Sequence, residues 1–242
     1  MSLVKRKEKE LDYESAEAYR ALRTNLQFCG NDKKTVVFTS CTPDEGKSTV
    51  ILNLATFLAE AEKRVLLIDA DLRKSVMTGN FKIESKSKGL THFLSGMCEL
   101  DDVINETDTP GLEIIFAGPN PPNPSELLGG SRFCELLKQA KEWYDYILID
   151  SAPLGSVIDS AIIAKECDGS AIIVESGVIS YRFVEEIKDQ LEKSGCPMLG
   201  VILNKTDYRE QKYYNRYYKR YGKYYSKYYG YGYGNKKQDK KQ

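Results

Sequence analysis

Short apolar segments alternate with helical ones along most of this chain, and this alternation limits its fold more than any other feature. The segment RVLLIDAD at 64–71 is nearly continuous in apolar residues before its acidic end. Such a run is typical of a strand that is buried on both faces of a parallel sheet. Further strands are expected at 35–40, 113–116, 146–150, 170–174 and 199–204, and helices at 13–29, 47–61, 131–143 and 180–194. The pattern predicts an α/β fold, a doubly wound and mainly parallel sheet with helices on both faces.

The strand expected at 35–40 leads into a loop that is typical of phosphate-binding proteins. Residues 41–49 read CTPDEGKST, and the last four of them open the next helix. Backbone N–H groups at a helix start bind phosphate, while the lysine reaches the outer phosphates and the serine hydroxyl reaches Mg²⁺. The segment therefore predicts a P-loop NTPase-like domain. The residues expected to contact the nucleotide here are Thr42, Asp44, Glu45, Gly46, Lys47, Ser48 and Thr49.

This loop departs from the regular pattern at two positions. The pattern GxxxxGK[ST] requires glycine at position 41, where this chain has Cys41. Asp44 places a carboxylate in the loop, which should weaken the binding of a triphosphate unless the side chain points outward. We therefore expect nucleotide affinity to depend on where Asp44 lies.

Aspartates close two of the predicted strands. Asp69 and Asp71 end the segment 64–71, and Asp150 ends the segment 146–150. Ligands of such sheets bind at the carboxyl ends of the strands, and strand side chains alternate between faces, so Asp69 and Asp71 are expected to point together into the crevice. Carboxylates there would hold Mg²⁺ through waters or accept a proton from an incoming nucleophile. The simpler alternative is a set of solvated strand ends.

Two other polar residues have weaker signals. The segment LNKTD at 203–207 resembles the NKxD base-reading motif of GTPases, which makes Asn204 a candidate nucleobase contact. The alternative is a polar strand end, and the segment does not decide between ATP and GTP. His92 is the single histidine, and we expect it to be a helix-surface or packing residue because no second histidine can share a metal with it.

The two ends of the chain differ from its middle. Residues 1–30 are expected to form an N-terminal segment that is loose over 1–12, and residues 31–207 the P-loop domain. Residues 208–242 hold twelve of the seventeen tyrosines, with eleven Lys and Arg against two Asp and Glu. A tail with almost no aliphatic residues cannot bury a core, so it should be disordered. Its charge of +9, against −9 for the rest, favours the chain's own acidic body, an anionic membrane or nucleic acid as its partner.

The cysteines and the hydropathy indicate a cellular location. The six cysteines are scattered without metal-like spacing, which favours free thiols in a reducing cytosol. No apolar run approaches the roughly 18 residues that span a bilayer, and the N-terminus lacks the features of a signal peptide. The sequence thus predicts a soluble, cytoplasmic protein that only another component would bring to a membrane.

Taken together, these segments resemble the bacterial tyrosine kinases of capsule and exopolysaccharide synthesis, in the short cytoplasmic form that lacks the membrane domain. The resemblance covers nearly the whole chain, whereas the HRD, DFG and VAIK motifs of eukaryotic kinases are absent. The family loop usually reads PGEGKS, so Asp44 is a departure from it. The matching segments are Glu17-x-x-Arg20-x-x-Arg23, PDEGKST (43–49), LLIDADLR (66–73), PPNPSELL (121–128), YILIDSAP (146–153) and the terminal tyrosine cluster.

The resemblance implies an ATP- and Mg²⁺-dependent protein tyrosine kinase that phosphorylates its own tail. Lys47 and Ser48 would bind the phosphates and Mg²⁺, and Asp69 would be the general base for the tyrosine hydroxyl. Asp71 and Asp150 would organise the metal, of which Ser48 is the third ligand. The expected phosphoacceptors are Tyr213, Tyr214, Tyr217, Tyr218, Tyr221, Tyr224, Tyr225, Tyr228, Tyr229, Tyr231 and Tyr233.

The resemblance also implies partners. The helix with Glu17, Arg20 and Arg23 would join subunits into a homo-oligomeric ring, in which each subunit presents its tail to a neighbour. A separate transmembrane activator, the co-polymerase of the polysaccharide system, would recruit the kinase to the inner face of the cell membrane. A cognate tyrosine phosphatase would reverse the reaction, and no nucleic acid is expected.

Two other functions stay open on the residues alone. A partition or septum-type P-loop ATPase could use the basic, aromatic tail to bind nucleic acid or a membrane. Such ATPases typically have a lysine at the position of Thr42, which counts against this alternative. A scaffold that binds nucleotide without turnover is the second alternative, and Cys41 and Asp44 keep it open.

Overall fold

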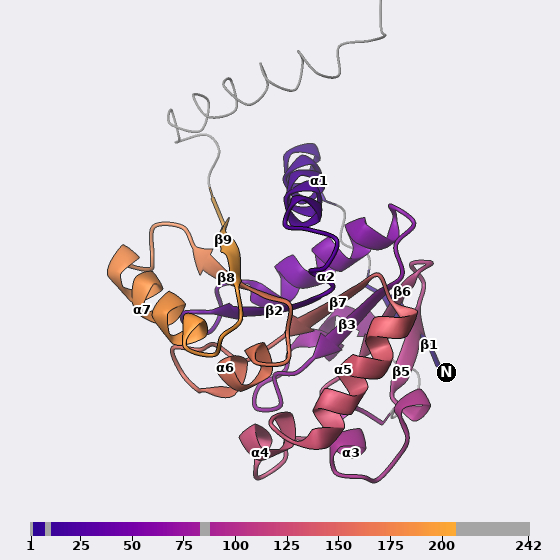
Figure 1. Ribbon diagram of the computed structural model, residues 1–242. Helices are drawn as coiled ribbons and strands as arrows, with labels where there is room; N and C mark the ends of the chain where they lie inside the picture. Colours follow the sequence, from indigo (N-terminus) through magenta and orange to yellow (C-terminus); the bar gives the residue numbers. More distant parts are fainter. Residues whose placement is uncertain (1, 8–10, 83–87, 207–242) are drawn as a thin grey trace, which may run out of the picture. The chain divides into compact units, whose positions relative to one another are not determined.

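A mixed β-sheet covered by helices forms the folded body of the protein (Figure 1). The computed structural model describes residues 2–7, 11–82 and 88–206. Within these residues nine strands join in the order β4-β1-β5-β6-β3-β7-β2-β8-β9. The strands are β1 (Ser2–Arg6), β2 (Thr35–Ser40), β3 (Val65–Asp69), β4 (Phe81–Lys82), β5 (Ile104–Thr107), β6 (Leu112–Ile115), β7 (Tyr146–Asp150), β8 (Gly169–Glu175) and β9 (Met198–Asn204). The helices are α1 (Tyr13–Phe28), α2 (Lys47–Ala59), α3 (Leu90–Leu94), α4 (Pro124–Leu128), α5 (Ser131–Trp143), α6 (Asp159–Ala164) and α7 (Tyr181–Glu192).

The centre of the sheet is parallel. Strands β6, β3, β7, β2, β8 and β9 run in the same direction, and every residue of β2, β3 and β7 is buried. The register pairs Asp69 at the end of β3 with Asp150 at the end of β7. The predicted doubly wound, P-loop NTPase-like fold is confirmed, and both aspartates lie at the carboxyl edge of the sheet.

Helices cover both faces of this sheet because successive strand residues face opposite sides. Val36 and Phe38 of β2 pack in one cluster with Leu26 of α1 and the apolar residues of α2. Val37 belongs to a second cluster with residues of α3, α5, α6 and α7 (Figure 1). The phosphate loop, which joins β2 to α2, is thus anchored between two packed elements.

Helix α1 begins where the sequence predicts and lies on α2. The Asp12 side chain caps it by accepting a hydrogen bond from the Ser15 N–H at 2.7 Å. Further along, the Tyr19 ring stacks on the Phe57 ring of α2 with centroids 5.6 Å apart. The apolar stripe of this helix therefore packs against its own domain.

The expectation that residues 1–12 are loose is wrong for residues 2–6. Strand β1 pairs in parallel with β5 and antiparallel with β4, and the Val4 side chain is only 1% exposed. Neither β4 nor β5 was predicted either, and β5 runs antiparallel to β6. These strands are short, and β1 pairs with partners in β5 that lie far along the chain, such as Thr107 beside Val4, so no local pattern marks them.

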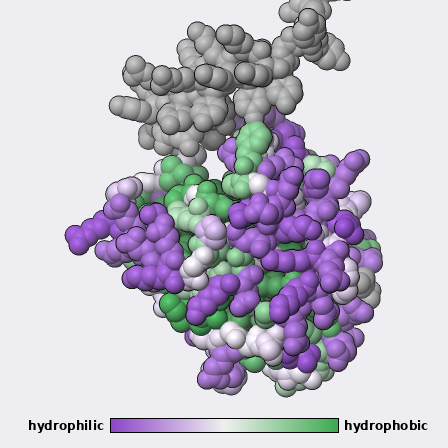
Figure 2. Space-filling view, in the orientation of Figure 1, coloured by the Kyte–Doolittle hydropathy of each residue, from purple (hydrophilic) through white to green (hydrophobic). Residues whose placement is uncertain are grey.

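Strand β9 forms the other edge of the sheet. Ile202 packs on the core, whereas Val201 and Leu203 are 48% and 43% exposed. Apolar residues accordingly show on the surface over β9 in Figure 2. The strand ends at Asn204, beside the phosphate loop, so the end of β9 forms part of the surroundings of the site described below.

Predictions for the tail concern residues outside the described part of the chain. They include its disorder and the eleven expected phosphoacceptors, all of which lie between residues 213 and 233. The boundary at residue 30 also stays a prediction. Among the described residues, no helix has both the length and the apolar character needed to cross a bilayer.

Candidate active site

The phosphate loop takes a conformation that two left-handed residues define. Gly46 has φ 84° and is the N-cap of α2, and Asp44 has φ 66°. A Cβ atom added to Gly46 would lie 2.3 Å from Nδ2 of Asn204, so both the backbone conformation and the space require glycine. No side chain of the described residues caps α2, which leaves the N–H groups of its first turn available to an anion.

Glu45 is the hub of this loop. Its side chain is 2% exposed, and Oε1 accepts hydrogen bonds from the N–H and the hydroxyl of Thr42. Oε2 accepts from the Glu175 N–H at 2.9 Å. Asn204 donates from Nδ2 to the Glu45 carbonyl at 2.8 Å, and Lys205 donates from Nζ to the Asp44 carbonyl at 2.8 Å. Thr42 and Glu45, both expected as nucleotide contacts, are thus hydrogen-bonded to each other within the loop.

Three charged side chains meet at the carboxyl ends of β3 and β7. Lys47, at the first position of α2, forms an ion pair with Oδ1 of Asp150, and the two residues are 7% and 1% exposed. Asp69 lies in register beside Asp150 and is fully buried. The Asp69 Oδ2 atom accepts a hydrogen bond from the Ser75 hydroxyl, whereas Oδ1 has no partner among the described residues. A buried carboxylate oxygen without a partner is costly, which makes this position a candidate functional residue.

Burial and a neighbouring charge perturb Asp69. Desolvation raises the pKa of its carboxyl from 3.8 to about 7, and the adjacent Asp150 acts in the same direction. The Ser75 hydrogen bond and the positive charge of Lys47 oppose this shift. A carboxylate with a pKa near neutrality can both take and release a proton under physiological conditions, as a general base must.

Asp71 does not lie on the strand as the sequence pattern suggested. β3 ends at Asp69, and Asp71 belongs to the turn that follows. Its Oδ1 atom accepts hydrogen bonds from the N–H groups of Arg73 and Lys74, at 3.2 and 3.0 Å. Asp71 thus lies near the site, as predicted, but a turn places it there rather than the alternation of strand side chains.

A network that the sequence reasoning missed ties three segments of the chain together. Arg73 donates from Nε and Nη2 to the Asp159 carboxylate, at 2.6 and 3.0 Å, and from Nη2 to the Ser125 hydroxyl at 3.0 Å. The Asp159 side chain is buried, and burial would raise its pKa, but the bonds from Arg73 and Ser125 outweigh burial and lower it. Arg73 and Ser125 stood in matched motifs. Asp159 had no sequence signal beyond being an acid at a helix start.

These elements enclose a cavity of about 360 Å³. The phosphate loop forms one wall, the turn after β3 forms a second, and the segment after β7 forms a third. Asp44 is exposed and is one of the residues that line the cavity, so its charge lies near any anion bound there. The lining residues are Ser40, Pro43, Asp44, Glu45, Gly46, Lys47, Ser48, Thr49, Asp71, Arg73, Lys74, Val76, Ala152, Pro153, Ser156 and Val157.

The residues of this cavity fit a nucleotide with Mg²⁺. The uncapped start of α2 and the Lys47 ammonium suit phosphates, and Ser48 and Asp71 both face the same cavity. The described residues contain no group of three or more His, Cys, Asp or Glu that could hold a metal by themselves. Mg²⁺ typically binds one or two protein oxygens together with substrate phosphates, so the two are sufficient.

The remaining sequence candidates lie away from the cavity. Arg20 forms an ion pair with Glu17 on the exposed side of α1 and lies over the Phe57 ring, 5.7 Å from its centroid. Arg23 donates to the Phe57 carbonyl at 3.0 Å. His92 accepts at Nδ1 from the Gly89 N–H at 3.1 Å, in keeping with the expected packing role.

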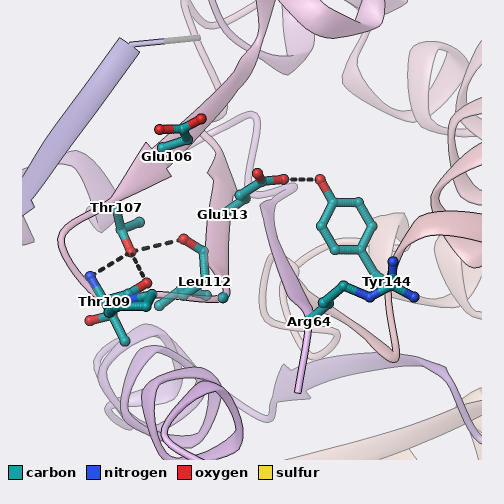
Figure 3. Close-up of a pocket in the computed structure, with 9 residues that line it drawn as sticks. Arg64, Glu106, Thr107, Thr109, Leu112, Glu113 and Tyr144 are labelled. Atoms are coloured by element: carbon teal, nitrogen blue, oxygen red, sulfur yellow. Dashed lines mark hydrogen bonds between the residues drawn. The ribbon is translucent and has the colours of Figure 1, made fainter. Parts of the chain in front are cut away.

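A second, smaller pocket lies at the opposite, amino edge of the parallel strands (Figure 3). Its volume is about 220 Å³, and it lies between the β5–β6 hairpin and Tyr144. The Tyr144 hydroxyl donates to Glu113, and Thr107 donates to the Leu112 carbonyl at 2.8 Å (Figure 3). Burial raises the pKa of Tyr144, so its hydroxyl stays protonated and keeps donating. This pocket has no phosphate-binding loop and lies on the edge where ligands of such sheets do not bind.

Comparison with known proteins identifies the family. The model of the AAA domain family matches residues 34–193. Tyrosine-protein kinase CpsD of Streptococcus agalactiae is 46% identical over 191 residues, which are 79% of this chain and 83% of that protein. The kinase domain of the Escherichia coli tyrosine kinase ETK superposes with a TM-score of 0.77 at 35% identity, over 81% of this chain and 78% of that one.

A more distant structure shares the fold alone. The septum site-determining protein MinD of Pyrococcus horikoshii, in complex with Mg-ADP, superposes with a TM-score of 0.60 at 24% identity, over 74% of this chain and 72% of that one. Both the identity and the structural similarity are lower than for the ETK kinase domain. The phosphate loop, the buried aspartate pair and these comparisons agree that the chain belongs to the bacterial tyrosine kinases and is a protein tyrosine kinase.

Proposed function

We propose that this kinase uses ATP and Mg²⁺ to phosphorylate the tyrosines of its own C-terminal tail. The observation that carries the proposal is the buried Asp69, which has an oxygen without a partner among the described residues and lies beside the Lys47–Asp150 pair, of which Lys47 lines the phosphate-loop cavity. A chain with twelve tyrosines in its last 35 residues offers a dense acceptor segment for such a site. The role of ATP also draws support from an ATP complex of Cyanothece McdA, which is 27% identical.

Each group has a distinct part in the transfer. ATP supplies the γ-phosphoryl group, and Ser48 and Asp71 would hold the Mg²⁺ ion, which would neutralise part of its charge. Lys47 exchanges its ion pair with Asp150 for the outer phosphates. The tyrosine hydroxyl, protonated at neutral pH because its pKa is near 10, passes its proton to Asp69 as its oxygen bonds to the γ-phosphorus and ADP leaves. Asp150, once Lys47 has moved to the phosphates, would help to organise the metal.

The direct test is the phosphorylation state of the tail. Purified protein is incubated with ATP and Mg²⁺, and the tail is analysed by mass spectrometry for the wild type and for Asp69→Ala. Phosphate on several of the tail tyrosines of the wild type and little on the variant is the expected result. An unmodified wild-type tail would contradict the proposal and favour the partition-type ATPase or the scaffold without turnover.

Transfer between subunits is the expected route. Isotope-labelled Lys47→Met chains, which keep the tail but lack the phosphate-binding lysine, are mixed with unlabelled wild type. The labelled tail should gain phosphate, because its tyrosines reach the active site of a wild-type neighbour. If only unlabelled tails are modified, the reaction stays within one chain.

A ring built through α1 would bring tails and active sites together. Glu17 and Arg20 are each about half exposed in their side chains, at 49%, so a neighbouring subunit can reach them. Arg23 instead holds α1 on α2 through the Phe57 carbonyl. Native mass spectrometry of Arg20→Glu should show loss of the oligomer, while Arg23 variants should first loosen the helix.

The wider cellular role follows the family resemblance. We propose that the kinase regulates capsular or extracellular polysaccharide synthesis and export, is activated by a separate transmembrane co-polymerase, and is reset by a cognate tyrosine phosphatase. Recruitment to the inner face of the cell membrane would then depend on that activator. Fluorescence imaging of the tagged kinase with and without the activator tests this: a signal that stays diffuse in both strains argues against recruitment.

A further inference from the structure

The phosphate loop is held from outside by the end of the last strand. Lys205 donates from Nζ to the Asp44 carbonyl at 2.8 Å and pairs with Oε2 of Glu175 at 2.8 Å. Asn204 donates from Nδ2 to the Glu45 carbonyl at 2.8 Å. Two consecutive loop carbonyls are therefore engaged by two consecutive residues that lie 159 and 161 positions away in the chain.

The ends of β8 and β9, from which these contacts are made, are hydrogen-bonded to each other. In the β8–β9 ladder Asn204 is the partner of Glu175, and the Asn204 carbonyl accepts from the Ser176 N–H at 2.9 Å. The Glu175 N–H in turn donates to Oε2 of Glu45 at 2.9 Å. Strand ends that are bonded to each other form a rigid support, so the contacts from 204 and 205 impose a position on the loop.

The loop needs such support because of its backbone. Asp44 has φ 66°, a left-handed conformation that costs a non-glycine residue on the order of 1 kcal/mol. In a trans peptide unit the C=O and the next N–H point in opposite directions. Holding the carbonyls of Asp44 and Glu45 against Lys205 and Asn204 therefore turns the N–H groups of Glu45 and Gly46 the other way. Both of these residues line the cavity.

We propose that Asn204 and Lys205 clamp the phosphate loop and are positioning residues for nucleotide binding. Without the clamp a loop peptide can flip, and it then presents a carbonyl oxygen instead of an N–H to the phosphates. The inference rests on the proposed binding of ATP in this loop, and it assigns to the end of β9 a role in ATP affinity rather than in the chemical step.

The test separates the loop bond from the ion pair. Lys205→Met removes both contacts, Glu175→Gln removes only the ion pair, and Lys205→Arg keeps a cationic donor. The Lys205 side chain is 46% exposed, so the loss of its bond should be moderate. Lys205→Met should raise the KM for ATP about three- to tenfold with kcat within about twofold, Glu175→Gln should raise it less than about twofold, and Lys205→Arg should restore it. Lys193→Met, at an exposed lysine at the end of α7, is the matched control.

Hydrogen exchange of the nucleotide-free protein tests, independently of any reaction, whether the clamp holds the loop. The amides of Thr42, Asp44, Glu45 and Gly46 should exchange several-fold faster in Lys205→Met than in wild type or Lys193→Met. Unchanged exchange together with an unchanged KM overturns the clamp. A wild type that binds no ATP would instead contradict the proposed function while the exchange result still judges the clamp.

Discussion

Both edges of the parallel sheet contain carboxylates that are wholly or partly buried, and these carboxylates differ in their hydrogen-bond partners. At the amino edge the half-buried Glu113 accepts the Tyr144 hydroxyl, and the neighbouring Thr107 hydroxyl has its own carbonyl partner (Figure 3). At the carboxyl edge Asp69 keeps one buried oxygen without a partner among the described residues, next to a second aspartate. A carboxylate whose hydrogen bonds are satisfied stabilises the fold, whereas a buried carboxylate oxygen without a partner is costly and is a candidate for binding or catalysis.

Under the proposed function, this contrast makes the same kind of residue a structural element at one edge and a reactive one at the other. Asp150 differs from its neighbour Asp69 in the same way. It is nearly as buried as Asp69, but it has Lys47 as its counterion. Four predictions test the contrast, in decreasing order of the expected effect.

Asp69→Asn should lower the rate of tail phosphorylation about 10²- to 10⁴-fold, the usual contribution of a general base. The amide can accept a hydrogen bond from Ser75 but cannot take the tyrosine proton. Initial rates are measured by phosphotyrosine immunodetection at saturating ATP, with Tyr144→Phe as the control at the other edge. A variant that keeps about a tenth of the wild-type rate would remove Asp69 from the chemistry.

The stability of the wild type should fall as the pH rises from about 4 to about 7. Asp69 has its folded-state pKa raised from 3.8 to about 7, so over this range the folded state holds a proton that the unfolded state has released. Raising the pH removes that proton from the folded protein, at a cost of up to about 4 kcal/mol. Urea unfolding at pH 4 and 8 measures this difference, and Asp69→Asn should show a smaller one. An equal pH dependence in both proteins would refute the assignment.

Tyr144→Phe should destabilise the protein by about 1–3 kcal/mol while the kinase rate stays within about twofold. The substitution removes the donor to Glu113 and leaves a carboxylate short of a partner. Thermal unfolding and the tail assay are compared on the same samples. A large loss of rate at unchanged stability would place function at the amino edge as well.

ATP should be preferred over GTP by about tenfold in KM. One N–H of the Asn204 side-chain amide is committed to the Glu45 carbonyl, and we expect the Oδ1 acceptor to face the base. An acceptor there suits the exocyclic amine of adenine and disfavours the carbonyl of guanine at the same place, which is worth about 1.4 kcal/mol. Equal KM values for the two nucleotides would mean that Asn204 serves only as part of the clamp.

Much of this architecture follows from local pattern. The apolar runs at β2, β3 and β7 and the helical stretches at α1 and α5 were located to within a residue or two, because burial on both faces and helical periodicity leave local marks. Strand β1 was missed because its stability comes from β5, far along the chain. Asp71 was placed correctly near the site for the wrong reason, since the strand ends two residues earlier.

Local sequence patterns established the fold class, the phosphate loop and the identity of the charged residues, because glycine, lysine and strand-end aspartates at these spacings have few other uses. Which of those groups are paired depended on the tertiary structure. The folded structure pairs Asp150 with a counterion, joins Arg73 to Asp159, and leaves one Asp69 oxygen without a partner in the described part of the chain. Pairing depends on distances between segments that are remote in the chain, such as Lys205 and Asp44, and those distances exist only after the sheet has brought the strand ends together.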